Sequence, residues 1–516
     1  MSPWNLSLAL LSGLLLVLAF PRFDLEVVAW GALIPLFRSL RGTSPVQASL
    51  LGFLAGFSFF TGLLPWIYNV LNQYGHIPGP VSVVLLLLLT AYLALYFSAF
   101  AFVLRWAQTR MDLPETLLAP PLWVSLEYIR GFLFSGFPWE LLGYSQYLTL
   151  PLIQISDLTG VYGVSFLIVL VNATGYRVLE ASTDGNWRPV RKEVLAAGFL
   201  LALSSAYGYF RLSEWRLESR EGTPLRIALI QGNIPQDVKW DSRFQEETMA
   251  IYTDLTRRAR AAFPHLVIWP ETATPFFFQD TFPHRSRILE LAEELKTHLL
   301  FGSPGYDRKG RELRYYNSAF LISPEGKIAG RYDKIHLVPF GEFTPLRDYF
   351  PFLRNISVQM GDFFPGQSHG PIKTGDGALG VLICFEGVFP SITNETVRQG
   401  ANVLVNITND AWFGRTSAPY QHLGFYIFRA VETDRWVLRS ANTGISAVID
   451  PQGRIRARTG LFERTVLTGT FAMKDTKTFY VRHGDYFVLL AALALLTAVA
   501  YSFFRKKTFV RKGKSR

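Results

Sequence analysis

Long, uncharged apolar runs confined to two parts of the chain constrain the fold of this sequence most strongly. Nearly all of them lie in residues 1–210 and 486–504, whereas residues 211–485 have the mixed composition of a globular domain. A helix needs about 20 mostly apolar residues to cross the ~30 Å hydrocarbon core of a bilayer. With 49% hydrophobic and only 18% charged residues, the whole chain is also too apolar for an ordinary soluble protein. The pattern therefore predicts a multi-pass α-helical membrane domain joined to an extramembrane domain.

Eight segments are predicted to span the membrane. They are residues 5–20, 26–40, 47–68, 82–104, 115–130, 159–178, 194–210 and 486–504. The first is expected to be retained as a helix, because it lacks the positive n-region and the small-residue cleavage site of a signal peptide. The predicted organisation is a seven-helix membrane domain, an extramembrane domain, an eighth helix and a basic tail, at residues 1–210, 211–485, 486–504 and 505–516.

The connections between these segments differ in charge and so predict an orientation. Basic residues occupy the connections 38–46, 105–114 and 177–193, and none occur in the alternate connections 69–81 and 131–151. By the positive-inside rule the basic connections and both termini are cytoplasmic, which places the extramembrane domain on the other side. In a bacterium this is the periplasmic side of the inner membrane. A single cysteine suits that oxidising compartment, where stray thiols form disulfides.

The formal charge of +11 does not indicate a nucleic-acid partner. Seven of the basic residues lie in the tail 505–516, directly after the last apolar segment. Such a tail is typical of a cytoplasmic anchor that attracts anionic lipid headgroups. No nucleic-acid recognition motif accompanies it.

From residue 225 onward, short apolar runs alternate with amphipathic segments, which predicts an α/β layered domain. The expected strands are 226–231, 266–269, 299–302, 318–322, 327–331, 379–384, 403–407, 437–441, 446–449 and 464–469. The expected helices are 243–262, 284–297, 390–399 and 419–434.

Cys384 is the only cysteine in the sequence and ends a strand-like apolar run. A lone thiol can form neither an intrachain disulfide nor a multi-cysteine metal site, so it is either a small buried hydrophobe or a nucleophile. Free cysteines are among the most buried residues, and the residue alone favours the first interpretation. Two other segments favour the second, since Glu271 follows the strand-like run 265–268 and Lys334 follows 327–331. A carboxylate, an amine and a thiol at three strand ends are the parts of a cysteine acyl-transfer site.

The chemistry assigns a different task to each of these groups. A thiol is a good nucleophile only as its thiolate, and free cysteine titrates near pH ~8.5. Glu271 is suited to accept the proton, and a neighbouring ammonium favours the thiolate. Lys334 and the backbone N–H of Phe385 are candidate donors to the oxyanion of a tetrahedral intermediate. Glu342 adds another acid nearby, although such a lone acid is more often a structural hydrogen-bonding group.

In this order, Glu271, Lys334 and Cys384 resemble the nitrilase superfamily, whose Glu-Lys-Cys site acts on amides, nitriles and acyl groups. The eight-helix membrane domain narrows the resemblance to the apolipoprotein N-acyltransferase family. The motifs that carry it lie at 230–236, 239–240, 269–273, 332–342, 384–386 and 409–414, with a membrane-side motif at 137–146. The resemblance implies an α/β nitrilase-like αββα sandwich for residues 211–485.

The resemblance also implies residues that support the site. These are Trp240, Asn317, Glu342, Phe385 and Glu386. Family members often carry tyrosine after the nucleophile where this chain has Phe385, so the ring is kept and the hydroxyl is lost. The backbone donor at this position is unaffected.

The implied reaction has two steps and uses no cofactor or metal. Cys384 takes an acyl chain from a membrane phospholipid as a thioester. The N-terminal amine of an S-diacylglyceryl-cysteine apolipoprotein then attacks that thioester. The partners are therefore a phospholipid donor, a diacylated apolipoprotein and the bilayer, with no nucleic acid. No nucleotide-binding Gly-rich loop and no H-E-x-x-H metal motif occurs in the sequence.

Aromatic residues are candidates for a lipid entrance or a lid that keeps water from the thioester. Trp139 and Tyr144 lie in the apolar connection 131–151, while Phe277 and Trp412 lie in the predicted catalytic domain. For each, ordinary packing or membrane anchoring is the competing interpretation.

Two alternative functions remain open from sequence. A membrane-tethered amidase would use the same site on small soluble amides, although a tether needs one helix rather than eight. A transporter or scaffold with a degenerate catalytic domain would place ionisable residues inside its spans. Glu127 and Asp157 are such residues, and both lie near predicted helix ends.

Overall fold

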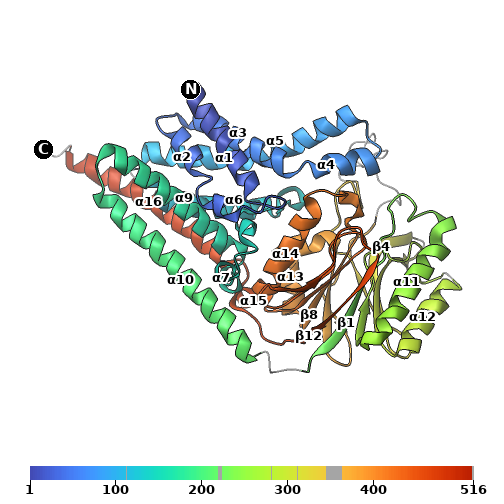
Figure 1. Cartoon of the computed structure of the whole chain (residues 1–516). Coiled ribbons are helices and arrows are strands. Elements are labelled where there is room, and N and C mark those ends of the chain that lie inside the picture. The colour runs from blue at the N-terminus through green and yellow to red at the C-terminus, as the bar shows by residue number, and fades with distance from the viewer. Residues whose placement is uncertain (112, 219–222, 281, 311, 345–362, 514–516) are drawn as a thin grey trace. The chain divides into compact units, whose positions relative to one another are not determined.

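The computed structural model describes residues 1–111, 113–218, 223–280, 282–310, 312–344 and 363–513. The chain forms two compact units. Unit 1 comprises Met1–Asn72, His76–Leu212 and Asp485–Arg516, and unit 2 comprises Gln73–Gly75 and Ser213–Gly484. Figure 1 labels their elements along the chain.

Unit 1 is helical. Its main helices are α1 (Pro3–Leu18), α2 (Ile34–Leu40), α3 (Pro45–Leu63), α5 (Gly79–Arg110), α6 (Glu115–Arg130), α9 (Val161–Asp184) and α16 (Tyr486–Gly513), together with most of α10 (Arg188–Glu218). Among the described residues, four helical stretches are long and apolar enough to cross a membrane. They are Pro45–Leu63, Gly79–Arg110, Val161–Asp184 and Val190–Ser213, with shorter apolar helices at Pro3–Leu18 and Tyr486–Tyr501.

The expected spanning helix at 26–40 is wrong. This segment forms a 3-10 helix, η1 (Glu26–Trp30), and then the seven-residue α2, with Gly31 between them. Pro35 lies in the first turn of α2, where its missing N–H and fixed φ favour a helix start over a helix interior. At 1.5 Å per residue, α2 is only about 10 Å long, too short to cross a bilayer alone.

Small residues allow close helix packing in unit 1. Gly52 and Gly56 of α3 face Phe97 of α5, and a Cβ added at Gly56 would lie 2.8 Å from the Phe97 Cβ. Close backbone approach at small residues is how helices associate inside membranes, where no hydrophobic force drives them together.

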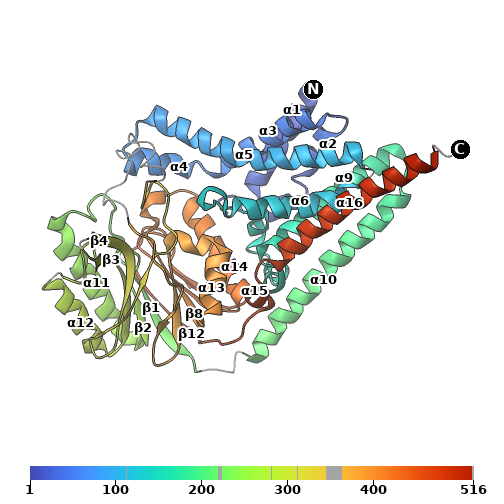
Figure 2. The same ribbon diagram turned by 180° about the vertical axis from the view of Figure 1, so that it is seen from behind.

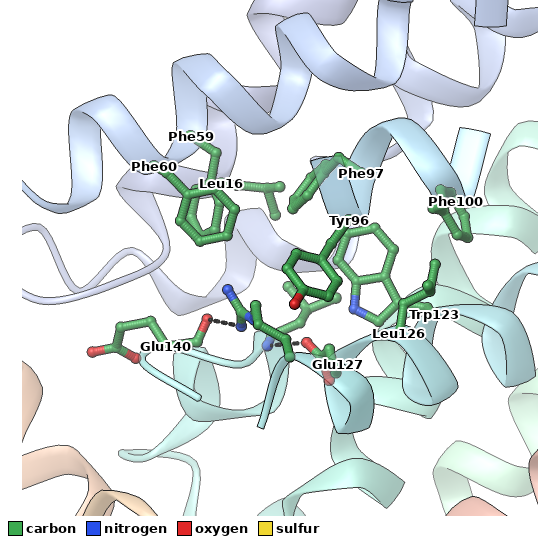
Figure 3. A pocket seen from close by; sticks show the side chains of 12 residues that line it. Leu16, Phe59, Phe60, Tyr96, Phe97, Phe100, Trp123, Leu126, Glu127 and Glu140 are labelled. Carbon is green, nitrogen blue, oxygen red and sulfur yellow. Dashed lines mark hydrogen bonds between the residues drawn. The ribbon is translucent and has the colours of Figure 1, made fainter. Parts of the chain in front are cut away.

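The connection after α6 is folded into unit 1 by hydrogen bonds to that helix. It contains η4, a 3-10 helix at Leu142–Gln146 whose five residues are all buried. The backbone N–H of Leu142 donates to Glu127 Oε1 at 2.6 Å, and Arg130 donates to the carbonyl of Glu140 at 3.4 Å. Both bonds border a pocket that aromatic residues line (Figure 3). These aromatic residues are Phe59, Phe60, Tyr96, Phe97, Phe100 and Trp123.

Unit 2 is built on two six-stranded sheets. The first has the order β12-β1-β2-β3-β4-β5 and the second the order β11-β10-β9-β8-β7-β6. The strands are β1 (Leu225–Gln231), β2 (Leu266–Ile268), β3 (His298–Lys309), β4 (Glu312–Ile322), β5 (Ile328–Asp333), β6 (Ile372–Lys373), β7 (Ala378–Ile383), β8 (Val403–Thr408), β9 (Val437–Ala441), β10 (Ala447–Ile449), β11 (Ile455–Arg458) and β12 (Thr465–Phe471).

The two sheets pack face to face and helices cover their outer faces. One buried core joins Leu229 and Ile268 of the first sheet to Val381 and Val405 of the second. In Figures 1 and 2, α11 (Gln245–Ala259) and α12 (His284–Leu295) lie outside the first sheet, while α13 (Pro390–Arg398) and α14 (Ala418–Thr433) lie outside the second. The predicted αββα sandwich and helical membrane domain are confirmed as the fold class.

Two strands of the sandwich were not predicted from the sequence. β6 has only two residues. β11 reads Ile-Arg-Ala-Arg and alternates half-buried with exposed positions, so it lacks the apolar run that marked the other strands. They are the two outermost strands of the second sheet, where burial constrains the amino-acid composition least.

Candidate active site

The three residues predicted as catalytic each follow a strand of unit 2. Glu271 comes three residues after the end of β2, Lys334 directly follows β5, and Cys384 directly follows β7. β2 runs parallel to its neighbours β1 and β3, and β7 runs parallel to β8. The carboxyl ends of parallel strands are where α/β proteins place ligand sites.

Cys384 lies on a sharp turn between β7 and a 3-10 helix, η8 (Cys384–Val388). Its φ is +52°, a left-handed conformation that non-glycine residues rarely adopt and that is typical of functional sites. Its carbonyl accepts a hydrogen bond from the Tyr426 hydroxyl at 2.8 Å. Gly387 allows this approach, because a Cβ there would lie 2.2 Å from the Tyr426 ring. Cys384 as a whole is half-buried at this turn.

Glu271 and Lys334 belong to one buried network of acids and amides. Glu271 Oε1 accepts from Asn317 Nδ2 at 2.8 Å and lies 3.7 Å from Lys334 Nζ. Glu271 Oε2 accepts from the backbone N–H of Asn409 at 2.9 Å. Glu342 pairs with Lys334 at 2.8 Å and accepts from the same Asn317 amide at 2.7 Å. Asn317 therefore bridges the two carboxylates, and Lys334 is held between them.

The charges of this network act on the thiol. Burial alone would lower the pKa of Lys334, but the carboxylates of Glu342 and Glu271 raise it above its ordinary value, so Lys334 remains a cation. Burial and then Glu271 raise the pKa of Cys384, and Lys334 opposes them. The resting group is therefore a thiol, and a base must take its proton at the moment of attack.

Glu386 connects the lysine loop to the cysteine turn. It is fully buried, and its Oε1 accepts from the backbone N–H groups of Ile335 and His336 at 2.6 and 3.2 Å. Its Oε2 accepts from the N–H of Ile383 at 2.6 Å. Burial raises the pKa of Glu386 to about 7, although these backbone donors lower it. Glu386 thus holds the backbone beside Lys334 against the residue that precedes Cys384.

Phe385, next after Cys384, and Trp240 are the two remaining predicted supporting residues. Phe385 packs on His336 and on Phe389, at 5.9 and 5.0 Å between ring centroids. Trp240 is half-buried in the turn directly after Lys239.

The aromatic lid candidates fall into both units. Phe277 packs on Tyr315 at 5.5 Å, and Trp412 lies in the 3-10 helix η9 (Asp410–Phe413). Trp139 and Tyr144 are fully buried within unit 1, each 1% exposed. The role of these four aromatic residues at a lipid entrance or lid stays a prediction.

Three features of the site were not predicted from the sequence. Asn409 follows β8 and supplies a backbone donor to Glu271. Asp410 lies 2.7 Å from Arg439 and 3.0 Å from His422, whose Nε2 is 3.3 Å from the Cys384 carbonyl. Lys239 donates to the backbone carbonyl of Glu271. Lys239, Asn409 and Asp410 lie in motifs that carried the family resemblance, but Asp410 and Arg439 are 29 residues apart and their pairing is visible only in the fold.

The sandwich fold and the cysteine, carboxylate and ammonium at its strand ends define an enzyme of the carbon–nitrogen hydrolase class. Residues 226–480 match the carbon–nitrogen hydrolase family, and residues 12–174 match the apolipoprotein N-acyltransferase N-terminal domain. The chain is 47% identical to an apolipoprotein N-acyltransferase of Geobacter metallireducens, over 97% of this chain and 95% of that protein. It is 37% identical to one of Methylococcus capsulatus, over 93% and 92% of the two chains. The chain belongs to the apolipoprotein N-acyltransferase family.

Solved structures similar to part of this chain include an amidase from Nesterenkonia sp. The match has a TM-score of 0.39 and 20% sequence identity, and it covers 52% of this chain and 97% of the amidase.

Proposed function

We propose that this enzyme transfers an acyl chain from a membrane phospholipid, through a thioester on Cys384, to the N-terminal amine of an S-diacylglyceryl-cysteine apolipoprotein. The observation that carries the proposal is the network in which Asn317, Glu342 and Lys334 hold Glu271 near the thiol of Cys384. A chain with this site and several apolar helices is suited to substrates that stay in the bilayer. Extracting an acyl chain into water costs about 0.8 kcal/mol per CH₂.

In the first half-reaction, Glu271 accepts the thiol proton while the sulfur of Cys384 attacks the ester carbonyl of the phospholipid. Lys334 and the backbone N–H of Phe385 donate to the oxyanion of the tetrahedral intermediate. When the intermediate collapses, the C–O bond to the glycerol breaks. Glu271 returns its proton to that oxygen, and a lysophospholipid leaves. The enzyme keeps the acyl group as a thioester.

In the second half-reaction, the apolipoprotein α-amine attacks the thioester carbonyl. An α-amino group titrates near ~7.7–8.0, so a useful fraction is neutral at pH 7. The C–S bond then breaks, the remaining amine proton passes through Glu271 to the sulfur, and an N-acylated lipoprotein leaves. We propose that apolar side chains such as Phe277 and Trp412 form a lid that keeps water from the thioester.

We propose that the enzyme lies in the bacterial inner membrane with its catalytic domain in the periplasm and both termini in the cytoplasm. The basic connections 38–46, 105–114 and 177–193 support this orientation.

The experiment is intact-mass spectrometry of the purified protein after incubation with phospholipid vesicles. We expect the wild type to gain the mass of one acyl group, which neutral hydroxylamine removes, and the Cys384→Ala variant to gain none. Addition of a diacylated lipopeptide should discharge the acyl group and yield a triacylated peptide. A wild-type enzyme that never gains acyl mass would contradict the proposal. Ammonia release from a soluble amide without lipid would instead favour the amidase alternative.

A further inference from the structure

A second lysine is buried next to the acyl-transfer network. Lys239 is 3% exposed, and its Nζ donates to the backbone carbonyl of Glu271 at 3.1 Å. This bond holds the main chain of the residue whose carboxylate serves as the base. Lys239 thus contacts the site from the turn between β1 and α11.

Unlike Lys334, Lys239 has no ion-pair partner in the described part of the chain. Among the described residues, no carboxylate oxygen lies within 4.0 Å of the Lys239 ammonium, whereas Lys334 lies 2.8 Å from Glu342. A buried cation that has a hydrogen bond to a backbone carbonyl but no paired anion recovers only part of its lost hydration, which is unfavourable in a folded protein. Such a group is therefore a candidate for a functional role rather than a stabilising one.

The electrostatics show which groups Lys239 acts on. Burial lowers the pKa of Lys239 to about 8, while the charges of Glu271 and Cys384 raise it. The lysine is therefore still mostly a cation near pH 7, and it interacts with both the base and the nucleophile. Other charged or titratable groups also act on Cys384 from the neighbouring elements. These are Glu271, Lys334, Asp410 and Tyr426.

A second cation would stabilise the Cys384 thiolate because the network around it carries excess negative charge. Glu271 and Glu342 carry two negative charges against one positive charge on Lys334, so the network is already negative before the thiol ionises. The negative charge of Asp410 is paired with Arg439 at 2.7 Å. A thiolate on Cys384 would add a further negative charge to this group. Among the residues that the structure describes, Lys239 is a further cation in contact with this network, through the Glu271 carbonyl, and it can offset that charge.

We propose that Lys239 is a positioning residue of the acyl-transfer site, which fixes the backbone of Glu271 and supplies positive charge that favours the Cys384 thiolate. The inference rests on the proposed role of Cys384 as the nucleophile. It predicts a property of the thiol that is measurable without any lipid or lipoprotein substrate.

The test is the rate of Cys384 alkylation by iodoacetamide, measured by intact mass from about pH 6 to about pH 10 on the full-length protein. Because the sequence has one cysteine, every adduct reports on Cys384. We expect Lys239→Met to slow alkylation about tenfold at pH 7, and the difference from the wild type to shrink above about pH 8, where the wild-type lysine loses its charge. Lys239→Arg keeps a permanent cation and should react within about threefold of the wild type. Acyl-thioester formation should fall in parallel in the Met variant and be largely retained in the Arg variant.

Lys474→Met is the matched control. Lys474 is a half-buried lysine of unit 2, and its Nζ lies 2.8 Å from Asp434. This variant should lose some stability and leave the alkylation profile unchanged. If the Met variant of Lys239 does not fold, Lys239→Gln makes the same comparison, since it keeps a donor for the Glu271 carbonyl without the charge.

A folded Met or Gln variant whose alkylation profile superimposes on that of the wild type would overturn the proposal. If Lys239→Arg slowed alkylation as much as Lys239→Met, the proposal would also be overturned, because the charge would then not be the cause. A wild-type enzyme that never forms an acyl-thioester would contradict the proposed function instead, and the alkylation comparison separates the two failures.

Discussion

Asn317 shows how one neutral side chain organises a charged site. Its amide donates to Glu271 at 2.8 Å and to Glu342 at 2.7 Å, and the residue is 5% exposed. The buried carboxylate of Glu271 and the half-buried carboxylate of Glu342 share this donor group and are held at a fixed separation. Lys334 can then contact both of them, which keeps the base and the oxyanion donor in place. Asn317 lies in the middle of β4, where asparagine is disfavoured by strand propensity, so its role here comes from the partners that the fold supplies.

We expect Asn317→Ala to lower the acyl-transfer rate about 100-fold, because small misplacements of catalytic groups have effects of this size. The free energy of unfolding should fall by about 1–3 kcal/mol, since a buried and a half-buried acceptor lose their shared donor. The measurements are thioester formation by intact mass and thermal unfolding.

Asn394→Ala is the matched control for that prediction. Asn394 is 4% exposed and its amide donates to the Tyr480 carbonyl at 3.0 Å, away from the catalytic network. It should lose similar stability and keep its rate. Equal rates in the two variants would show that Asn317 has only a structural role.

At the scale of elements, the cysteine turn is held by α14 as well as by its own strand. Tyr426 and His422 of this helix both approach the carbonyl of Cys384, and His422 is in turn in contact with Asp410 of η9. Burial would raise the pKa of Asp410, but Arg439 and His422 lower it to about 2. A left-handed turn therefore has support from a helix and from a buried ion pair.

Asp410→Asn is expected to destabilise the protein by about 3–5 kcal/mol, because it leaves the buried Arg439 without its anion. The folded pKa of Asp410 lies below that of the unfolded chain, so its contribution to stability is present above about pH 4 and is lost as the pH falls towards 2. The variant should therefore show a weaker loss of stability than the wild type over that range. Unfolding followed at several pH values checks this, and the acyl-transfer rate should also fall.

Glu432→Gln provides the control at the other end of α14. Glu432 pairs with Arg429 at 3.0 Å, and both side chains are buried. It lies ten residues from His422, about 15 Å along the helix. We expect a comparable loss of stability without a selective loss of rate. A wild-type rate in folded Asp410→Asn would contradict the support of the turn by α14.

At the scale of the whole molecule, the chain combines an αββα catalytic unit with a helical unit that carries four helices long enough to cross a bilayer among its described residues. The orientation we propose depends on the distribution of lysine and arginine over the connections. It therefore has its own test, independent of the chemistry.

Cysteine labelling in a Cys384→Ser background tests the orientation. We expect a membrane-impermeant maleimide to label Lys327→Cys, an exposed position of unit 2, in intact spheroplasts. Asn186→Cys, exposed in the connection between α9 and α10, should react only after lysis. The opposite pattern would contradict a periplasmic catalytic domain.

The sequence alone determined the fold class and the family. Apolar runs and strand–helix alternation are local properties of the chain, and the strand-end positions of Glu271, Lys334 and Cys384 can be found along it. Only the tertiary structure decided which polar groups meet. The bridge by Asn317, the Asp410–Arg439 pair and the bond from Lys239 to Glu271 join segments far apart in the sequence, and their pairing depends on strand order and packing. The break of the segment 26–40 into two short helices was likewise decided in the fold, because hydropathy measures how apolar a segment is and not whether its backbone continues as one helix.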